Sequence, residues 1–104
     1  MVCIATRYNL LPMIKSFRHA GIERFFLRGT KAGIQAAHAD KLRRQLGRLD
    51  DATQPADMDI PGWRLHRLSG RMKDHWSVWV NGNWRLTFKF DGQDAVLVDY
   101  QDYH

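Results

Sequence analysis

The chain closes on side chains that are suited to proton transfer. Asp102, Tyr103 and His104 supply a carboxylate, a phenol and an imidazole, directly after a segment with strand composition at residues 94–100. Carboxylates and imidazoles are common general acids and bases, and imidazole titrates near neutrality, so it suits either role. The alternative interpretation is a polar chain end that merely follows the last strand. Residues further upstream are needed to choose between the two.

A second histidine and an arginine occupy predicted strands upstream. His66 shares one face of residues 63–68 with Arg64, because side chains alternate with period two along a strand. Arg85 lies opposite a row of apolar side chains in a later strand. If the polar faces coincide, His66 and Arg85 converge with the C-terminal residues. The simpler interpretations are a half-buried strand histidine and an arginine paired with an aspartate such as Asp99.

These side-chain types suit the cleavage of RNA. The 2′-hydroxyl must lose a proton, the leaving 5′-oxygen must gain one, and the phosphate must be held while its charge redistributes. Two imidazoles, or an imidazole and a carboxylate, meet the first two needs. Arg85 offers a rigid fork of donors to phosphate oxygens, and the ring and hydroxyl of Tyr103 could stack on a base or orient a proton carrier.

Length, charge and cysteine content limit the kind of protein. With 104 residues, the chain supports one domain and one compact site. Its 16 Lys and Arg against 11 Asp and Glu give a net charge of +5, which favours a polyanionic partner such as RNA, DNA or an acidic protein. The single cysteine excludes an intramolecular disulfide. The sequence shows neither a secretory signal nor a membrane span, and we expect a cytoplasmic protein.

The N-terminal half predicts a short strand and two helices. Residues 14–18 alternate apolar and polar, and residues 22–26 begin a helical pattern. Residues 36–51 predict a second helix, whose apolar stripe is Leu42, Leu46 and Leu49. Its remaining basic residues form either a solvated face, which we favour, or a docking surface for an anion: Lys41, Arg43, Arg44 and Arg48. His38 is expected on the solvated side.

The C-terminal half predicts antiparallel strands. Asn81-Gly82 is a strong hairpin signal between two alternating segments, and Asp91-Gly92 marks the next turn. The order predicts an α+β fold, with an N-terminal strand and two helices packed on one face of a mainly antiparallel, twisted sheet. The tryptophans are better explained as core and strand residues than as base-stacking platforms. Trp79 is the exception, since it lies on the minority face of its strand.

No metal or other cofactor is expected. The five histidines show no close pairing of the kind that binds zinc, and a single cysteine excludes a multi-cysteine site.

Six motifs, found in order over residues 13–104, together resemble the HigB toxins of the RelE and ParE superfamily. They are Met13-Ile14-Lys15-Ser16-Phe17, Lys31-Ala32-Gly33-Ile34, Pro61-Gly62-Trp63-Arg64-Leu65-His66, Trp76-Ser77-Val78, Asn83-Trp84-Arg85-Leu86-Thr87-Phe88 and Asp99-Tyr100-Gln101-Asp102-Tyr103-His104. The resemblance implies a RelE-like toxin domain over residues 13–104. Residues 1–12 would be an extension, either a start-site artefact or a tail.

The resemblance also implies site residues. The family's catalytic positions fall on His66, Arg85, Asp102, Tyr103 and His104. The loop after His66 departs from the family pattern, because Ser69 replaces a lysine that would hold the RNA backbone. Nearby basic residues could supply that charge, and we predict an RNA-binding set of Arg64, Arg67, Arg71, Lys73 and Lys89.

The implied function is that of a toxin in a type II toxin–antitoxin system, a ribosome-dependent endoribonuclease that cuts messenger RNA. The implied partners are the 70S ribosome, the message and a HigA-like helix-turn-helix antitoxin, through which operator DNA is reached indirectly. One alternative is an RNA- or antitoxin-binding module of the same fold that has lost its activity. Another is the ParE branch, which targets gyrase and lacks this ribonuclease set.

Overall fold

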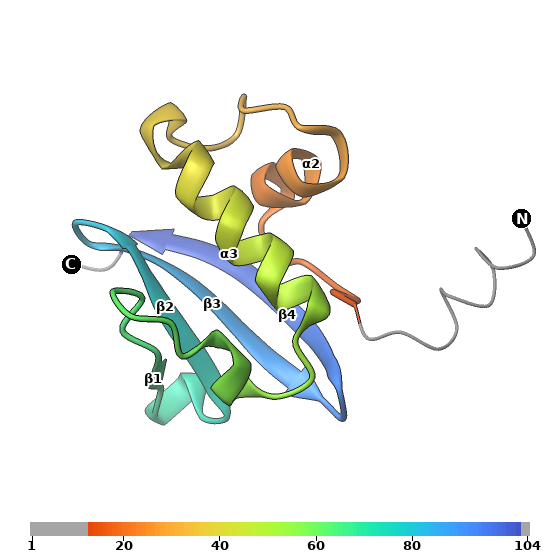
Figure 1. The fold of residues 1–104 in the computed structure, drawn as a ribbon, viewed down its shortest axis with the longest axis vertical. Helices are drawn as coiled ribbons and strands as arrows, with labels where there is room; N and C mark the ends of the chain where they lie inside the picture. The colour runs from red at the N-terminus through yellow and green to blue at the C-terminus, as the bar shows by residue number, and fades with distance from the viewer. Residues whose placement is uncertain (1–12, 103–104) are drawn as a thin grey trace, which may run out of the picture.

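The centre of the molecule is a four-stranded antiparallel sheet. The computed structural model describes residues 13–102. The strands are β1 (His66–Arg67), β2 (His75–Asn81), β3 (Trp84–Asp91) and β4 (Asp94–Asp102), and they pair in the order β1-β2-β3-β4 (Figure 1). The two hairpins form where the Asn81-Gly82 and Asp91-Gly92 signals predicted them, and Gly82 and Gly92 supply the positive φ angles of 55° and 64° that such turns require.

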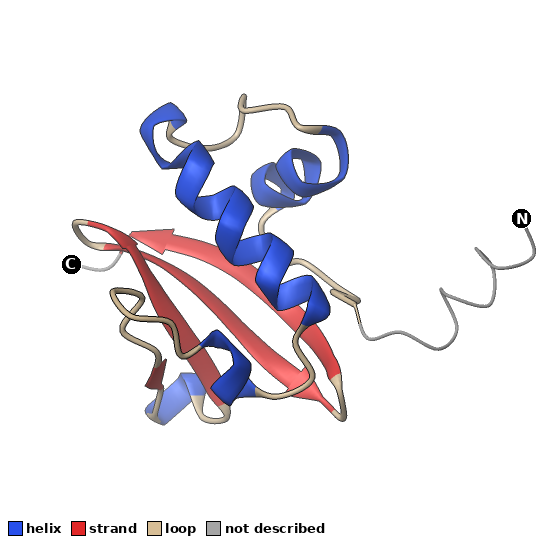
Figure 2. Ribbon diagram, viewed as in Figure 1, coloured by secondary structure: helices blue, strands red, loops and turns tan. Residues whose placement is uncertain are grey.

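Two α-helices, α2 (Ala20–Arg28) and α3 (Ala39–Asp51), lie on one side of this sheet (Figure 2). Three 3₁₀ turns accompany them: η1 (Ala36–His38), η2 (Pro55–Met58) and η3 (Gly70–Met72). The His19 side chain caps the start of α2 by accepting a hydrogen bond from the Ile22 amide, and Gly29 ends the helix in the left-handed conformation. Within residues 13–102, no helix is long and apolar enough to cross a membrane.

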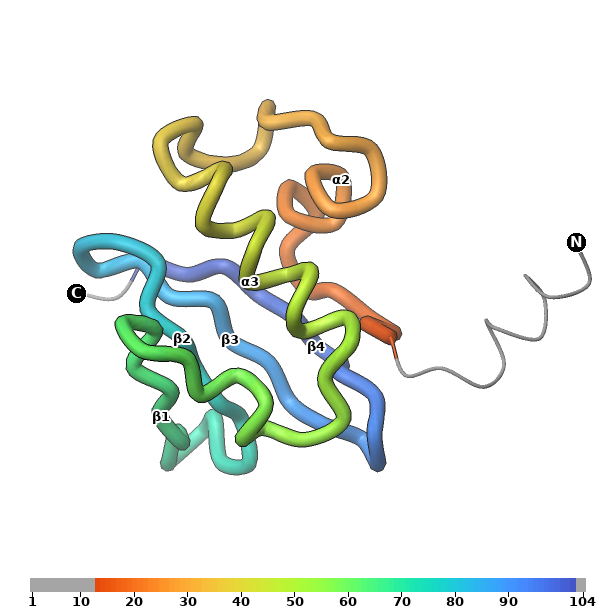
Figure 3. The backbone as a smooth tube through the Cα atoms, in the orientation of Figure 1, coloured from red at the N-terminus to blue at the C-terminus, as the bar shows by residue number. Residues whose placement is uncertain are grey.

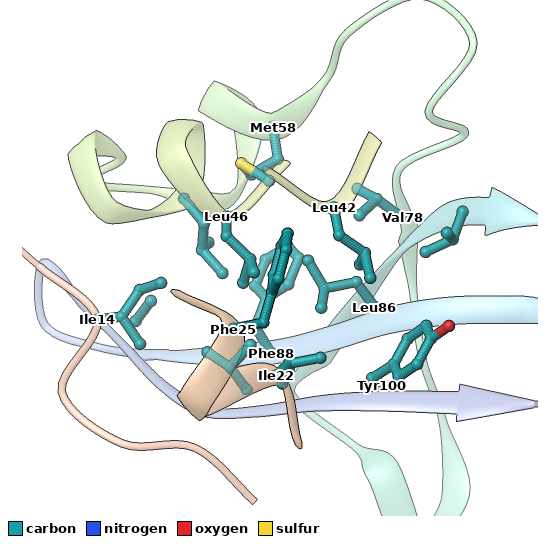
Figure 4. Packing of buried hydrophobic residues seen from close by; sticks show 14 of the residues in the cluster. Ile14, Ile22, Phe25, Leu42, Leu46, Met58, Val78, Leu86, Phe88 and Tyr100 are labelled. Carbon is teal, nitrogen blue, oxygen red and sulfur yellow. The ribbon is translucent and has the colours of Figure 1, made fainter. Parts of the chain in front are cut away.

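The core lies between α3 and the sheet. Leu42, Leu46 and Leu49 of α3 are fully buried, as their spacing predicted. They face Leu86 and Phe88 of β3, with Phe25 of α2 and Met58 of η2 closing the sides (Figure 4). The predicted α+β class is therefore confirmed, and the helices pack on one face of the sheet because each element buries its apolar stripe there.

The segment predicted as the first strand is less regular than expected. It runs parallel to β4 through two isolated bridges, Ile14 with Ala95 and Phe17 with Val98 (Figure 3). Between these bridges Leu97 takes a φ of 55°, and its amide donates to the Ser16 hydroxyl at 2.8 Å. This left-handed residue interrupts the extended backbone of β4 at that point, so a continuous ladder does not form.

The strand predicted over residues 63–68 is also shorter than expected. Only His66–Arg67 pairs with β2, through His66 with Ser77 and Arg67 with Trp76. The preceding residues form a turn, and Arg64 has a φ of 54°, which is not an extended conformation. The alternation that placed Arg64 and His66 on one strand face was therefore wrong, although both residues line the same hollow.

Candidate functional site

A hollow of about 550 Å³ opens where β1, β2 and β3 meet the loop before β1. Its walls come from residues far apart in the sequence: Arg64, Leu65, His66, Leu68, Ser77 and Arg85. One imidazole and two guanidinium groups thus line a single concave surface, with leucine side chains beside them. This is the convergence of His66 and Arg85 that the sequence permitted, and Arg64 joins it.

Strand pairing holds His66 in the wall. His66 lies opposite Ser77 of β2, and Ser77 lies opposite Thr87 of β3, two residues along from Arg85. The His66 side chain is exposed, so it contributes to the surface of the hollow and not to the core. An exposed imidazole beside cationic groups is accessible to a substrate and able to exchange protons with it.

The backbone of the β2–β3 hairpin holds Arg85. One terminal nitrogen, NH1, donates to the carbonyl oxygens of Gly82 and Trp84, each at 3.2 Å. The predicted alternative, an ion pair with Asp99, does not form: Asp99 lies opposite Thr87 and accepts a hydrogen bond from Gln101 at 2.8 Å. Anchoring at one nitrogen leaves the rest of the rigid guanidinium fork to meet an anion.

Of the three C-terminal residues predicted for the site, the structure describes only Asp102. Asp102 ends β4 opposite Trp84, whereas Arg85 lies opposite Gln101. Because side chains alternate along a strand, Asp102 projects from the opposite side of the sheet at this rung, and it does not line the hollow. Its negative charge contributes to raising the pKa of Tyr100, after the larger effect of burial. Tyr103 and His104 lie outside the described residues.

Of the predicted RNA-binding residues, only Arg64 lines the hollow. Arg64 lines the hollow, while Arg67 is paired with Asp74 at 3.3 Å and its guanidinium lies 5.9 Å from the ring centre of Trp76. Arg71 and Lys73 are exposed in and just after η3, and Lys89 lies opposite His75 in the sheet. These four residues do not line the hollow, so they could contact only RNA that extends beyond it.

His38 was predicted on the solvated side of the second helix, and this was wrong. The residue is 6% exposed, and its Nδ1 lies 2.6 Å from the Tyr100 hydroxyl of β4. Its ring also makes an edge-on contact with Trp84. A signal was present in the sequence: His38 precedes Leu42 by four residues and so extends the apolar stripe of α3.

Burial lowers the pKa of His38 below its ordinary value of 6.5. Unfolding returns the imidazole to water, so the unfolded chain binds a proton more readily below about pH 6.5. The contribution of His38 to stability is complete above that pH and is lost as the pH falls towards the folded-state pKa. We expect the stability advantage of wild type over His38→Gln, measured by urea unfolding, to shrink between about pH 7.5 and about pH 5. A constant difference would contradict this assignment.

The hollow can perform acid–base chemistry on a bound anion. Arg64 and Arg85 supply positive charge, Arg85 is fixed by the hairpin, and His66 supplies an exposed imidazole that can accept or donate a proton. Together with the sheet and the two helices on its one face, this defines a small α+β protein with a cationic, histidine-bearing hollow.

Comparison with known proteins gives the family. The model of the RelE-like toxin of the type II toxin–antitoxin system HigB matches residues 15–104. The chain therefore belongs to the HigB family of RelE-like toxins. A curated relative, the Endoribonuclease HigB of Proteus vulgaris, is 38% identical over 92 residues, which cover 88% of this chain and all of the relative.

Proposed function

We propose that this toxin is an endoribonuclease that cuts messenger RNA on the ribosome and so inhibits translation. The observation that carries the proposal is the hollow in which His66 lies with Arg64 and Arg85. Family membership supports it, as does the name of the Proteus vulgaris relative, an endoribonuclease. The net charge of +5 suits a substrate and a scaffold that are both made of RNA.

The proposed reaction is attack of a ribose 2′-oxygen on the adjacent phosphorus. The P–O5′ bond breaks, and the products are a 2′,3′-cyclic phosphate and a free 5′-hydroxyl. One group takes the proton of the 2′-hydroxyl and another gives a proton to the departing 5′-oxygen, so the proton count balances. His66 would fill one of these roles and His104 the other, because Asp102 projects from the other side of the sheet.

The remaining site residues would bind and orient the substrate. Arg85 would hold the phosphate oxygens as negative charge develops on them, since its fork is already fixed by two carbonyl groups. Arg64 would add a second positive charge from elsewhere in the lining of the hollow. Tyr103 would stack on a base or orient one of the proton carriers. No step in this scheme requires a metal or an organic cofactor.

The proposed partners follow from the family. A type II system pairs its toxin with an antitoxin, and we propose a HigA-like helix-turn-helix protein, through which the complex would reach operator DNA. The 70S ribosome and its message are the proposed site of action, and a cytoplasmic location is part of the same proposal. Binding to ribosomal RNA through dispersed basic groups would make association strongly salt-dependent.

Primer-extension mapping on a defined message in a reconstituted translation system tests the proposal. We expect new 5′ ends only when toxin and ribosomes are both present, and 2′,3′-cyclic phosphate on the upstream fragments. Cuts of equal strength on free message would contradict ribosome dependence. A folded wild-type chain that binds ribosomes and leaves the message intact would favour the alternative of an RNA- or antitoxin-binding module without activity.

A further inference from the structure

Two cations lie over the indole ring of Trp79, beside the hollow. The Lys41 ammonium of α3 is 4.2 Å from the ring centre, and the Arg64 guanidinium is 4.4 Å from it. Trp79 is half-buried in β2, and it is the tryptophan that lies on the minority face of its strand. A helix, a loop and a strand thus meet at one aromatic ring, with Arg64 common to this cluster and to the hollow.

Hydrogen bonds hold both the side chain and the backbone of Trp79 in place. Its Nε1 donates to the Gly82 carbonyl at 2.9 Å, the same oxygen that accepts a hydrogen bond from Arg85. The Trp79 carbonyl accepts from Gln45 of α3 at 2.9 Å, and the Trp79 amide donates to the Trp63 carbonyl at 2.6 Å. The ring is therefore a rigid platform, joined to the Arg85 side of the hollow through one carbonyl group.

The cluster has an excess of positive charge. Burial lowers the pKa of Lys41, and the neighbouring charges of Arg44 and Arg64 lower it further. Two ion pairs occur within residues 13–102, Arg43 with Asp40 and Arg67 with Asp74, and neither involves these three cations. A bound anion would relieve their mutual repulsion and would favour the charged form of Lys41.

We propose that Lys41 and Arg64 at the Trp79 ring, with the neighbouring Arg44, bind a backbone phosphate of the RNA strand next to the one held in the hollow. The inference rests on the proposed function, because Arg64 links the two sites. This continuity favours the RNA in the hollow over an acidic protein segment. The aromatic ring supports the same choice, since aromatic side chains beside cations are typical of surfaces that follow single-stranded RNA.

The test measures binding to a short single-stranded RNA that is 2′-O-methylated throughout and cannot be cut. We compare wild type, Lys41→Gln and Lys15→Gln by fluorescence anisotropy over a series of KCl concentrations. Lys15 is the matched control, since it is exposed and lies along β4, at the edge of the sheet away from β1. We expect Lys41→Gln to weaken binding about fivefold and to reduce the salt slope by about 0.7, the value for one phosphate contact on a single strand.

Two further variants interpret the result. Lys41→Arg should bind within about twofold of wild type, because it keeps the charge and the aromatic contact. Trp79→Phe, with its melting temperature checked, should weaken binding less than Lys41→Gln does. Equal losses in Lys41→Gln and Lys15→Gln would overturn the proposal in favour of diffuse attraction. Unchanged RNA binding with a weakened antitoxin complex would overturn it in favour of an acidic protein segment.

Two further measurements distinguish the source of the phosphate from the proposed function itself. Binding of Lys41→Gln to ribosomes without message should equal that of wild type, and a loss there would assign the phosphate to ribosomal RNA instead. Because the oligonucleotide cannot be cut, a wild type that binds it through Lys41 but never cleaves a message refutes the proposed function alone. Cleavage with Lys41-independent binding refutes the subsite alone.

Discussion

Replacing His66 with glutamine should reduce the rate of message cleavage on the ribosome by about 10²- to 10⁴-fold, the usual contribution of a general acid or base. Glutamine keeps hydrogen-bonding ability but cannot exchange a proton near neutrality. His66 is exposed at the wall of the hollow and makes no core contact, so the fold should be unaffected. The measurement is the single-turnover rate of cut-site formation at saturating toxin.

Ribosome binding and thermal melting separate lost chemistry from lost structure in this variant. Both should stay close to wild type in His66→Gln. His104→Ala is expected to remove cleavage in the same manner, since that imidazole would carry the second proton. Cleavage at the wild-type rate in a folded variant that lacks both histidines would contradict the proposed site.

Replacing Arg85 with lysine should reduce the maximal cleavage rate by about 10²- to 10³-fold, comparable with the loss of one donor to a developing charge. The substitution preserves the positive charge and removes the planar fork. Because lysine has a single ammonium, it cannot hold the Gly82 and Trp84 carbonyls and a phosphate in the same rigid arrangement. The measurement is the cleavage rate at saturating toxin, where weaker binding no longer contributes.

Arg67→Lys is the matched control for this substitution. Arg67 is exposed, lies outside the hollow and is paired with Asp74, so its replacement should change the maximal rate less than about threefold. A maximal rate for Arg85→Lys that matches the control would show that Arg85 does not stabilise the reacting phosphate. Melting curves for both variants exclude a loosened hairpin as the cause of any loss.

Local patterns were sufficient for most of the fold. The alternation of apolar residues predicted β2 and β3, because side chains point to alternate faces of a strand. Strand composition after the Asp91-Gly92 turn predicted β4. The spacing of Leu42, Leu46 and Leu49 predicted α3 for the same kind of reason. Asn81-Gly82 predicted the hairpin because few residue pairs accept the dihedral angles of that turn.

The candidate site was predictable only in part. His66 and Arg85 could be identified from their residue types and their places on polar strand faces, and the structure brings them into one hollow. Arg64 was predicted on the same strand face as His66, and this was wrong because its left-handed backbone breaks the alternation, although Arg64 does line the hollow. Asp102 was expected beside them, but the register of β4 with β3 places it opposite Trp84.

By itself, the sequence determined the helices, the hairpins and the residue types that can transfer protons, since each depends on neighbours within a few positions. Contacts between distant segments were decided in the folded chain. His38 is buried because it lies against Tyr100, 62 residues away in the sequence. Lys41 meets Arg64 at Trp79 because α3 packs against β2, where Gln45 donates to the Trp79 carbonyl. Such contacts depend on how whole elements pack, so periodicity within one element does not predict them.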